Sequence, residues 1–260
     1  MNSAVVLAER FRVPLCLALV FGVWQGVHGL AIVPDKFFPS IPAILAAFWQ
    51  MLTDGSVLVA WTTTFLRALI GLVVAATLGV ALAILSDLSP VLSRGIRYVS
   101  DVLQPIPPAA FVPMAVFMLG LGVKLYAFVI VLVTVWPTYL NGVAALQSVS
   151  PVQVNTGRMF GLSRSQLLWQ IRLPAALPQI FTGIRYAATI SLIAVIVSEM
   201  LAGRDGIGFM IYKKVNALRT PEVFGLMFLV AFSGSALNAL VAVLRRSMTA
   251  WHMGMMERRE

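Results

Sequence analysis

The feature that most constrains this chain is a series of long apolar runs that carry almost no charge. Four of them cover about residues 61–85, 125–146, 180–201 and 222–244. A helix that crosses the hydrocarbon core of a bilayer needs about 20 mostly apolar residues, and each run is long enough. Only 11% of the residues are charged, against about 25% in a typical soluble domain. We therefore predict an all-α integral membrane protein.

Two less regular runs bring the predicted number of transmembrane helices to six. One covers about residues 13–33, and the other covers residues 98–119 and contains four prolines. Four prolines exclude a straight helix, and backbone carbonyls freed at that depth must be buried in protein or line a cavity. Pro107 and Pro108 are therefore candidates for the lining of a translocation pathway. The alternative is a kink that serves packing alone.

The distribution of Lys and Arg predicts how these spans are oriented. Six spans put both ends of the chain on one side, together with the polar segments 86–97 and 150–174. This side holds eleven Lys and Arg residues, and the other side holds six. The positive-inside rule then places both termini and the segment 150–174 in the cytoplasm. The net charge of +9 is interpreted as a topology signal that also suits anionic lipid. No basic run is interleaved with aromatics, so we do not expect nucleic-acid binding.

Four of the six basic residues on the other side lie in the segment 203–221. They run against the charge rule, and they suit either an anionic substrate, an acidic partner surface or an ordinary solvated loop.

The segment 150–174 separates two apolar runs, and its local signals predict two short helices with a sharp joint. Ser150 can cap the first helix, and Pro151 suits the first helical position. Gly161 suits the left-handed residue that ends such a helix. Ser163 and Gln166 have the spacing of a capping box for a second helix. Pro174 disfavours helix at Leu173, so we expect a boundary there. From these signals alone, an amphipathic connector on the membrane surface is an equal alternative.

The spacing within this segment resembles a known motif. Asn155-Thr156-Gly157 is followed after three residues by Gly161, after nine more by Ile171, and then by Leu173-Pro174. This resembles the "EAA" loop of permease subunits in binding-protein-dependent ATP-binding cassette importers, although Asn155 replaces the acidic residue and Thr156-Gly157 replace the two alanines. The resemblance implies a cytoplasmic coupling helix that docks into a groove on a separate ATPase. The implied coupling residues are Asn155, Thr156, Gly157, Arg158, Gly161, Leu162, Ser163, Ile171, Leu173 and Pro174.

The resemblance extends over residues 40–246 and is strongest to the nitrate, sulfonate and taurine branch of these permeases. It rests also on Pro39-Ser40-Ile41-Pro42, on the proline-rich stretch 104–113, on Glu199-Met200-Leu201 and on the glycine-rich 206–209. It implies a type I, MetI-like importer fold with a five-helix core over residues 61–246. An amino-terminal span with an external amphipathic segment (1–60) would precede this core, and a cytoplasmic tail (247–260) would follow it.

The same resemblance implies the assembly and the activity. They are a homodimer in the inner membrane, two ATPase subunits, an external substrate-binding protein, and alternating access for a small anion.

The chain itself lacks signatures of catalysis. It contains no G-x-x-x-x-G-K-[ST] phosphate loop, no H-E-x-x-H and no Cys/His cluster. We therefore expect no enzyme activity, no bound metal and no cofactor of its own, with ATP held by the partner subunit. Three polar residues inside spans are further pathway candidates: Arg67, Asn141 and Glu199. An acid within a span is a functional candidate by default, and an ion pair with a neighbour is the alternative for Glu199.

Two other functions are compatible with a chain of this kind. An ion-coupled secondary transporter would need a coupling-ion site near mid-membrane, often at paired broken helices. Only the run 98–119 is heavily broken, and no pair of acids accompanies it. An intramembrane enzyme or respiratory anchor would need clustered His, Asp or Glu, which the sequence does not have.

Overall fold

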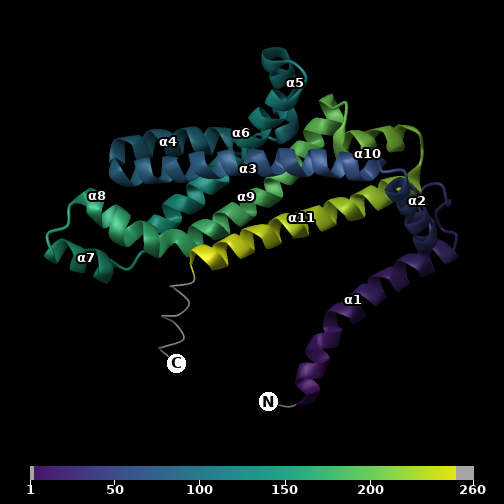
Figure 1. Cartoon of the computed structure of the whole chain (residues 1–260), viewed down its shortest axis with the longest axis horizontal. Coiled ribbons are helices and arrows are strands. Elements are labelled where there is room, and N and C mark those ends of the chain that lie inside the picture. Colours follow the sequence, from purple (N-terminus) through teal and green to yellow (C-terminus); the bar gives the residue numbers. More distant parts are fainter. Residues whose placement is uncertain (1–2, 250–260) are drawn as a thin grey trace. The chain divides into compact units, whose positions relative to one another are not determined.

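The computed structural model describes residues 3–249, which form helices joined by short turns without any strand (Figure 1). Four helical stretches in this range are long and apolar enough to cross a membrane: α3 (Ser56–Leu88), α6 (Val123–Gln147), the stretch Arg164–Ala202, and α11 (Thr220–Met248). The pair α4 (Pro90–Leu103) and α5 (Pro108–Leu119) gives a fifth crossing if the two together count as one span. The all-helical membrane architecture is thus confirmed, while the sixth span stays a prediction.

The chain divides into two compact units. The first comprises residues 1–59 and 210–230, with α1 (Ser3–Gly29) and α2 (Ile41–Thr53). Trp24 organises it, because its indole nitrogen donates to the carbonyl of Pro39 at 3.0 Å and its ring stacks on Phe38 at 4.3 Å. Ser40 caps α2 through its hydroxyl. The expected first span, 13–33, differs in its bounds, since α1 starts earlier and ends at Gly29.

The second unit comprises residues 60–209 and 231–260 and contains the helix pairs that matter for the site. Its core is the packing of α6 against α9 (Leu173–Ala202), with α5 against both. α3 packs closely on α6 through glycines: a Cβ at Gly71 would collide with Ile130, and one at Gly142 with the Cβ of Ala83. Small residues allow helix backbones to approach in a membrane, where burial of apolar surface does not drive association.

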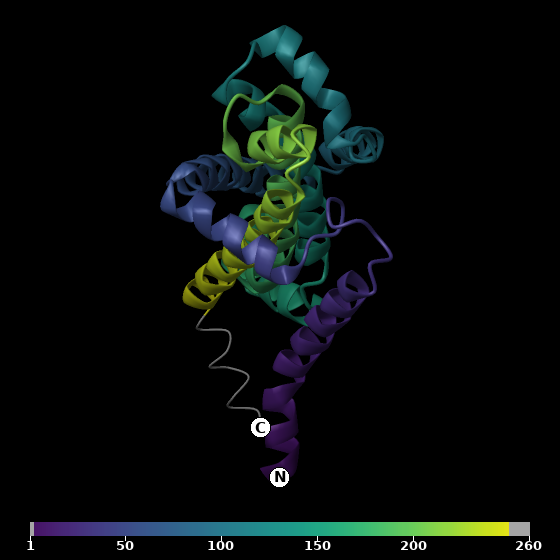
Figure 2. The same cartoon turned by 90° about the vertical axis from the view of Figure 1, so that its right-hand side faces the viewer.

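The proline-rich region is broken where the sequence predicted, but its surroundings differ. α4 and α5 meet at an angle of 100° around the break at residues 104–107 (Figure 2). The expected polar loop 86–97 is wrong: α3 continues to Leu88, and α4 starts at Pro90 with Ser89 as its N-cap. Ser-Pro at a helix start is a strong local signal, and one face of α4 is polar enough to resemble a loop in sequence.

Two boundaries in the later part of the chain also differ. No helix ends at Leu173. Instead, α8 (Arg164–Leu167) continues through a π-helical turn (Leu168–Arg172) directly into α9. π-Helix is rare and occurs mostly as single turns inside α-helices, frequently at functional sites. The expected loop 203–221 contains α10 (Gly206–Asn216). Of the predicted tail 247–260, residues 250–260 lie outside the described residues.

Candidate functional site

α7 (Pro151–Met159) ends in a tight joint that local sequence dictates. Gly161 has φ of +77°, a left-handed conformation that costs an L-residue about 1–2 kcal/mol. The N–H of Gly161 donates to the carbonyl of Arg158 at 2.9 Å, and the N–H of Leu162 donates to the carbonyl of Gly157 at 3.1 Å. These two bonds define the Schellman motif, so the predicted helix end is confirmed in its atomic detail.

The next helix starts two residues later with the predicted capping box. The Ser163 hydroxyl accepts from the N–H of Gln166 at 3.3 Å, and the Gln166 side chain accepts from the N–H of Ser163 at 2.9 Å. Ser150 occupies the N-cap position of α7, but its hydroxyl makes no capping bond. Pro151 has no N–H and the α7 start is exposed, so water serves the remaining donors.

Gly157 is where α7 packs against the helix that follows it. It is buried in the middle of α7, and a Cβ there would lie 2.5 Å from Cδ1 of Ile171 and 2.6 Å from Cδ2 of Leu167. Leu162 folds back onto the same spot. Gly157 and Ile171 thus form one contact, although they are fourteen residues apart and belong to two different helices. The joint has no room for an alanine without a shift of its neighbours.

The outer surface of this joint is apolar and exposed. Met159 is 88% exposed, Phe160 82% and Val152 72%. A groove of about 550 Å³ lies beside them, between α7 and the start of α9, and it is lined by Val152, Gln153, Thr156, Gly157, Phe160, Leu162, Gln170, Ile171, Pro174 and Ala175. Contiguous exposed apolar side chains beside a groove are typical of a protein–protein contact.

The other predicted coupling residues lie along the same segment. Asn155 and Arg158 are exposed and touch each other only at 3.5 Å. The Thr156 hydroxyl donates to the carbonyl of Val152 within α7. Leu173 and Pro174 begin α9 and are partly buried. Asn155 therefore points a short polar side chain outward, without a firm partner in its own chain.

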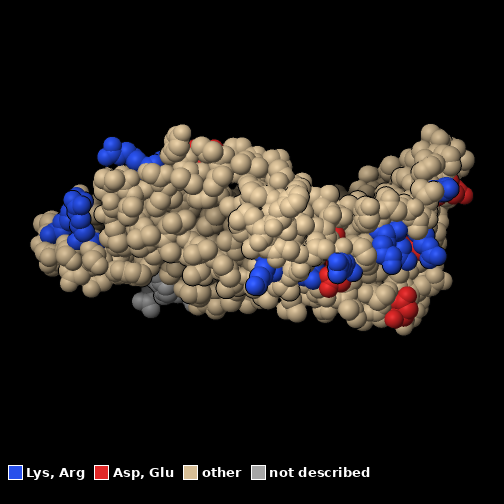
Figure 3. Space-filling model, turned by 90° about the horizontal axis from the view of Figure 1, so that it is seen from above, with Lys and Arg blue, Asp and Glu red and all other residues tan. Residues whose placement is uncertain are grey.

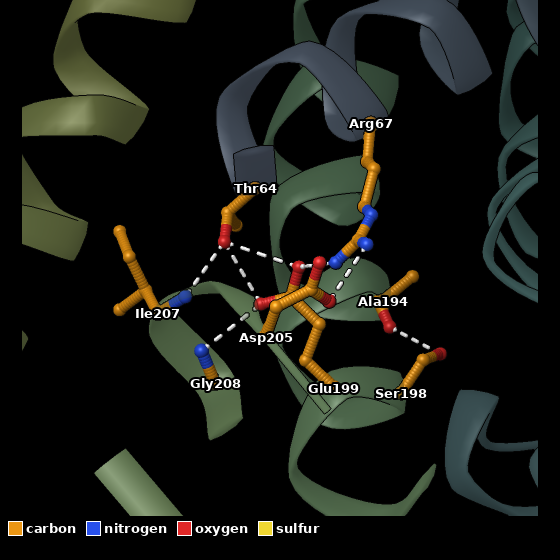
Figure 4. A network of polar contacts seen from close by, with 8 residues as sticks. All are labelled: Thr64, Arg67, Ala194, Ser198, Glu199, Asp205, Ile207 and Gly208. Atoms are coloured by element: carbon orange, nitrogen blue, oxygen red, sulfur yellow. Dashed lines mark hydrogen bonds and ion pairs between the residues drawn. The ribbon is translucent and has the colours of Figure 1, made fainter. Parts of the chain in front are cut away.

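A buried polar cluster lies at the other end of α9 (Figure 4). Its centre is the Glu199 carboxylate, which is fully buried. Arg67 donates to it at 2.8 Å, the Thr64 hydroxyl at 2.8 Å and the N–H of Gly208 at 3.0 Å. The N–H of Ile207 in turn donates to the Thr64 hydroxyl at 2.8 Å. The ion-pair alternative for Glu199 is thus confirmed, and the carboxylate also caps the positive N-terminus of α10.

Arg67 is held by three neighbouring side chains. One terminal nitrogen binds Glu199 and the other binds Asp205 at 2.8 Å, while the guanidinium lies 4.1 Å from the ring centre of Tyr126. Glycines let the loop after α9 close over this cluster: Gly206 has φ of +90°, and a Cβ there would collide with the Glu199 carboxylate. Both terminal nitrogens of Arg67 therefore donate to a carboxylate of this chain.

A second ion pair joins the same two helices at their other ends. Arg172, just before α9, donates to the Asp87 carboxylate near the end of α3 at 2.5 and 2.7 Å. α3 and α9 are therefore antiparallel and joined by an arginine–carboxylate pair at each end. Arg67 and Asp87 are 20 positions apart on α3, which corresponds to about 30 Å of helix, the thickness of the hydrocarbon core.

Figure 3 shows Lys and Arg at the end with α4 and α7, next to a broad band with almost no charged side chains; further Lys and Arg lie beyond this band together with Asp and Glu.

The remaining predicted pathway residues lie apart from both clusters. Pro107 is the N-cap of α5 and Pro108 its first residue, at the 100° bend. Asn141 lies in α6, where its amide donates to the carbonyl of Pro137 at 2.8 Å and its Cβ packs against Gly183. No group of His, Cys, Asp and Glu suited to a metal occurs within residues 3–249. The structure thus brings Arg67 and Glu199 together and leaves Pro107, Pro108 and Asn141 separate.

Sequence reasoning missed several partners in these clusters, among them Thr64, Asp205 and Asp87. It also passed over Arg185, a lone arginine inside the run 180–201. The signal for Arg185 was available, since an arginine without a nearby acid in the middle of an apolar span is exceptional.

Comparison with known proteins identifies the family. Residues 75–250 match the model of the binding-protein-dependent transport system inner membrane component. The chain belongs to this family. It is 27% identical over 241 residues to the taurine transport system permease protein TauC of Escherichia coli, covering 91% of this chain and 88% of TauC. It is 34% identical over 178 residues to the nitrate import permease protein NrtB of Synechocystis, covering 68% and 65% of the two chains.

The fold has solved counterparts as well. A chain of an amino acid ABC transporter crystallised with histidines aligns with a TM-score of 0.64 at 12% identity, over 77% of this chain and 98% of that chain. At this identity the likeness shows the fold alone. The permease fold and the multi-pass membrane location therefore follow from family and structure together.

Proposed function

We propose that this chain moves a small anion, such as nitrate, a sulfonate or a related organic acid, across the inner membrane. Transport is driven by ATP hydrolysed on a separate ATPase subunit. The names of TauC and NrtB, which share most of the chain's length, support this substrate class. Two copies of the chain form the membrane part, two ATPase subunits bind it from the cytoplasm, and an external binding protein delivers the solute.

The observation that carries the proposal is the joint between α7 and α8. It presents exposed apolar side chains beside a groove, yet its backbone is fixed by a Schellman motif, a capping box and the Gly157–Ile171 contact. A rigid, apolar projection suits a part that must dock on a partner and transmit its movement. Asn155 through Gly161 form the docking surface, and Ile171, Leu173 and Pro174 hold it to α9.

Alternating access then follows from this connection. When ATP closes the ATPase dimer, the two α7 helices move together, and the continuous helix from Arg164 to Ala202 carries the motion into the membrane. The Arg172–Asp87 pair transmits it to α3. The pathway between the two copies opens outward, receives the solute, and opens inward after hydrolysis. Both termini lie in the cytoplasm in this arrangement.

Arg67 and Glu199 fit a fastening role at the external end of the spans better than direct contact with solute, because each already has partners within the chain. Asn141, Pro107 and Pro108 lie on helices that reshape the pathway when α5 and α6 move. If Arg67 does bind solute, Arg67→Ala must abolish uptake even where the folded amount and the ATPase activity are unchanged.

A pull-down tests the coupling part of the proposal. The chain is purified in mild detergent with its ATPase, comparing wild type with Gly161→Asp and Gly161→Asn. Asn and Asp both tolerate the left-handed conformation, so the two variants differ in charge alone. Gly161→Asn should keep the ATPase, and Gly161→Asp should lose it because it places a negative charge on an apolar docking surface. Gly95→Asp is the matched control, because Gly95 lies in α4 with open space around it. Retention of ATPase by all variants would refute the coupling role of this joint.

Uptake into proteoliposomes tests the substrate class. The complete complex with its binding protein should accumulate labelled nitrate, taurine or an alkanesulfonate only when ATP is supplied. Uptake driven by an ion gradient without ATP would favour the secondary transporter instead. Such a transporter often uses paired broken helices, and within residues 3–249 only α4–α5 is a bent pair that is together apolar and long enough to span the membrane.

A further inference from the structure

Arg185 holds an unusual position in the membrane part of the chain. It lies 13 positions after Arg172 and 14 before Glu199, the residues of α9 that form the two terminal ion pairs. It is therefore at the middle of the segment that crosses the hydrocarbon core, about 20 Å along the helix from either end. That is too far for its side chain to reach the interface by snorkelling.

The Arg185 side chain is exposed and has no hydrogen bond or ion pair within residues 3–249. A charge at this depth is costly in lipid, and such residues almost always face the protein interior or water. Among the Asp and Glu of the described residues, only Asp101 lies inside a span, beside the α4–α5 bend, if that pair counts as one crossing; the others lie at an end of a long span or outside the spans. The counter-charge of Arg185 therefore comes from outside its own fold, either from Asp101 of a second copy or from a bound anion.

The neighbours of Arg185 on the exposed face of α9 are polar as well. Thr182 precedes Arg185 by three positions, Tyr186 and Thr189 follow it by one and four, and all three are exposed, with Tyr186 at 59%. The opposite face of α9 is buried and apolar, with Phe181, Ala187 and Ala188 in the core. This is the reverse of a helix that faces lipid.

α3 gives the contrast at the same depth. Its exposed face carries Ile70, Val73, Val74 and Leu78, all apolar and between 43% and 57% exposed, and one exposed threonine, Thr77, whose hydroxyl donates to the carbonyl of Val73. This face carries no charged residue. Lipid satisfies that face, whereas the polar face of α9 needs water or a polar partner.

We propose that Thr182, Arg185, Tyr186 and Thr189 form an anion-binding stretch at mid-membrane, in a water-filled path that a second copy of the chain completes. Arg185 supplies the charge: its guanidinium is always protonated, and its planar fork matches the oxygens of an oxyanion. The Tyr186 and Thr189 hydroxyls supply further donors, although Thr189 also accepts from the Asn238 amide at 3.4 Å. The Thr182 hydroxyl donates to the carbonyl of Pro178 at 3.3 Å and must release this bond to donate to an anion. Arg67 cannot serve in this way, since Glu199 and Asp205 already occupy it.

The assignment rests on the proposed import of an anion and names the residues that select it. Each copy contributes one arginine with hydroxyl neighbours, a weak site from which the solute can leave, as a conduction path requires.

Thiol labelling tests whether this face meets water. Cys16, the only cysteine, is replaced by Ser, and Thr182→Cys, Thr189→Cys and Leu78→Cys are made in the complete complex. A charged methanethiosulfonate reacts with a thiolate, which forms only in contact with water. Thr182→Cys and Thr189→Cys should react, and Leu78→Cys should not. If Thr182→Cys and Thr189→Cys are as unreactive as Leu78→Cys, the α9 face is dry and the assignment fails.

Transport tests the role of the charge, using whichever of labelled nitrate, taurine or alkanesulfonate the wild-type complex accumulates. Arg185→Gln should lower uptake about tenfold or more, while Arg185→Lys keeps part of it. ATPase activity and assembly should change less than about twofold in both variants, as in the control Arg94→Gln, since Arg185 has no structural partner. Normal uptake by Arg185→Gln, or a parallel loss of assembly, would overturn the assignment. If wild type moves none of these anions but does move a neutral solute, the proposed substrate class itself fails.

Discussion

The two ends of α9 treat their exceptional residues in opposite ways. At the Glu199 end, a buried carboxylate is completely surrounded by donors of its own chain. At the α7 end, apolar side chains such as Met159 and Phe160 are more than four-fifths exposed, beside a groove. At the first end a charged carboxylate is buried, although burial of an unpaired charge is costly. At the second end large apolar side chains are exposed, although exposure of apolar surface to water is unfavourable.

The two ends thus differ in whether the chain itself provides the contacts that these side chains need. The buried Glu199 carboxylate has all its hydrogen-bond partners within this chain, so it supports the fold. The apolar α7 surface is not covered by the described residues, and we propose that it serves an assembly. Substitutions at the two ends should therefore appear in different measurements: stability of the isolated chain at the first, and retention of the ATPase at the second.

The largest effect is expected from Glu199→Ala. It leaves Arg67 with a single carboxylate partner and leaves the donors of Thr64 and Gly208 buried without an acceptor. Removal of one member of a buried ion pair typically costs about 3–5 kcal/mol. The apparent melting temperature of the chain in detergent, followed by size-exclusion chromatography, should fall sharply.

Glu222→Ala is the control for this change, because Glu222 pairs with Lys214 and Arg219 only at 3.7 and 3.4 Å. It should lower the melting temperature far less. Equal effects of the two substitutions would mean that the Glu199 cluster is not a special support of the fold.

A smaller effect on stability, and a larger one on assembly, is expected from Gly157→Val. The new side chain would overlap Ile171 and Leu167 and force α7 away from α9. Overpacking of this kind costs about 1–3 kcal/mol. The folded chain should be recovered, but the amount of ATPase that co-purifies with it should drop. Undiminished co-purification would show that the position of α7 against α9 does not matter for docking.

The α7–α8 joint was predictable because its causes are local. Gly161 ends one helix, and Ser163 with Gln166 starts the next, all within six residues of sequence. The proline break before α5 was predictable for the same reason. The role of Gly157 was not: its close contact with Ile171 exists only once the two helices are packed.

The partners within the polar clusters could not be predicted from the sequence. Thr64 and Glu199 are separated by 135 residues, and Asp87 and Arg172 by 85. Nothing local identifies these pairs, because only the antiparallel packing of α3 and α9 brings them together. The start of helix α4 was missed for a different reason. Its charged residues lower the hydropathy of the segment 86–97 and made it resemble a polar loop, although Ser89-Pro90 is a helix-start signal.

Substitutions in the Asp87–Arg172 pair should lower stability by an intermediate amount, because this ion pair is only partly buried. The Asp87 side chain is 12% exposed and that of Arg172 27%. Asp87→Arg should lower stability by about 1 kcal/mol, the upper range for partly exposed pairs. The double variant Asp87→Arg with Arg172→Asp should regain most of this loss in the same melting assay. A double variant no better than the single one would show that the pair does not hold α3 to α9.

The smallest effect on stability is expected at Asn155, and this residue gives the sharpest test of the contrast. Its side chain is exposed and has one long contact, to Arg158. Asn155→Ala should therefore change the stability of the isolated chain by no more than about 0.5 kcal/mol. If the exposed end serves a partner, the same change should weaken ATPase retention in the pull-down, and Asn155→Gln should preserve part of it through the amide. If Asn155→Ala lowers the melting temperature but leaves ATPase retention intact, the α7 surface belongs to the fold of the chain, and the division between the two ends of α9 is wrong.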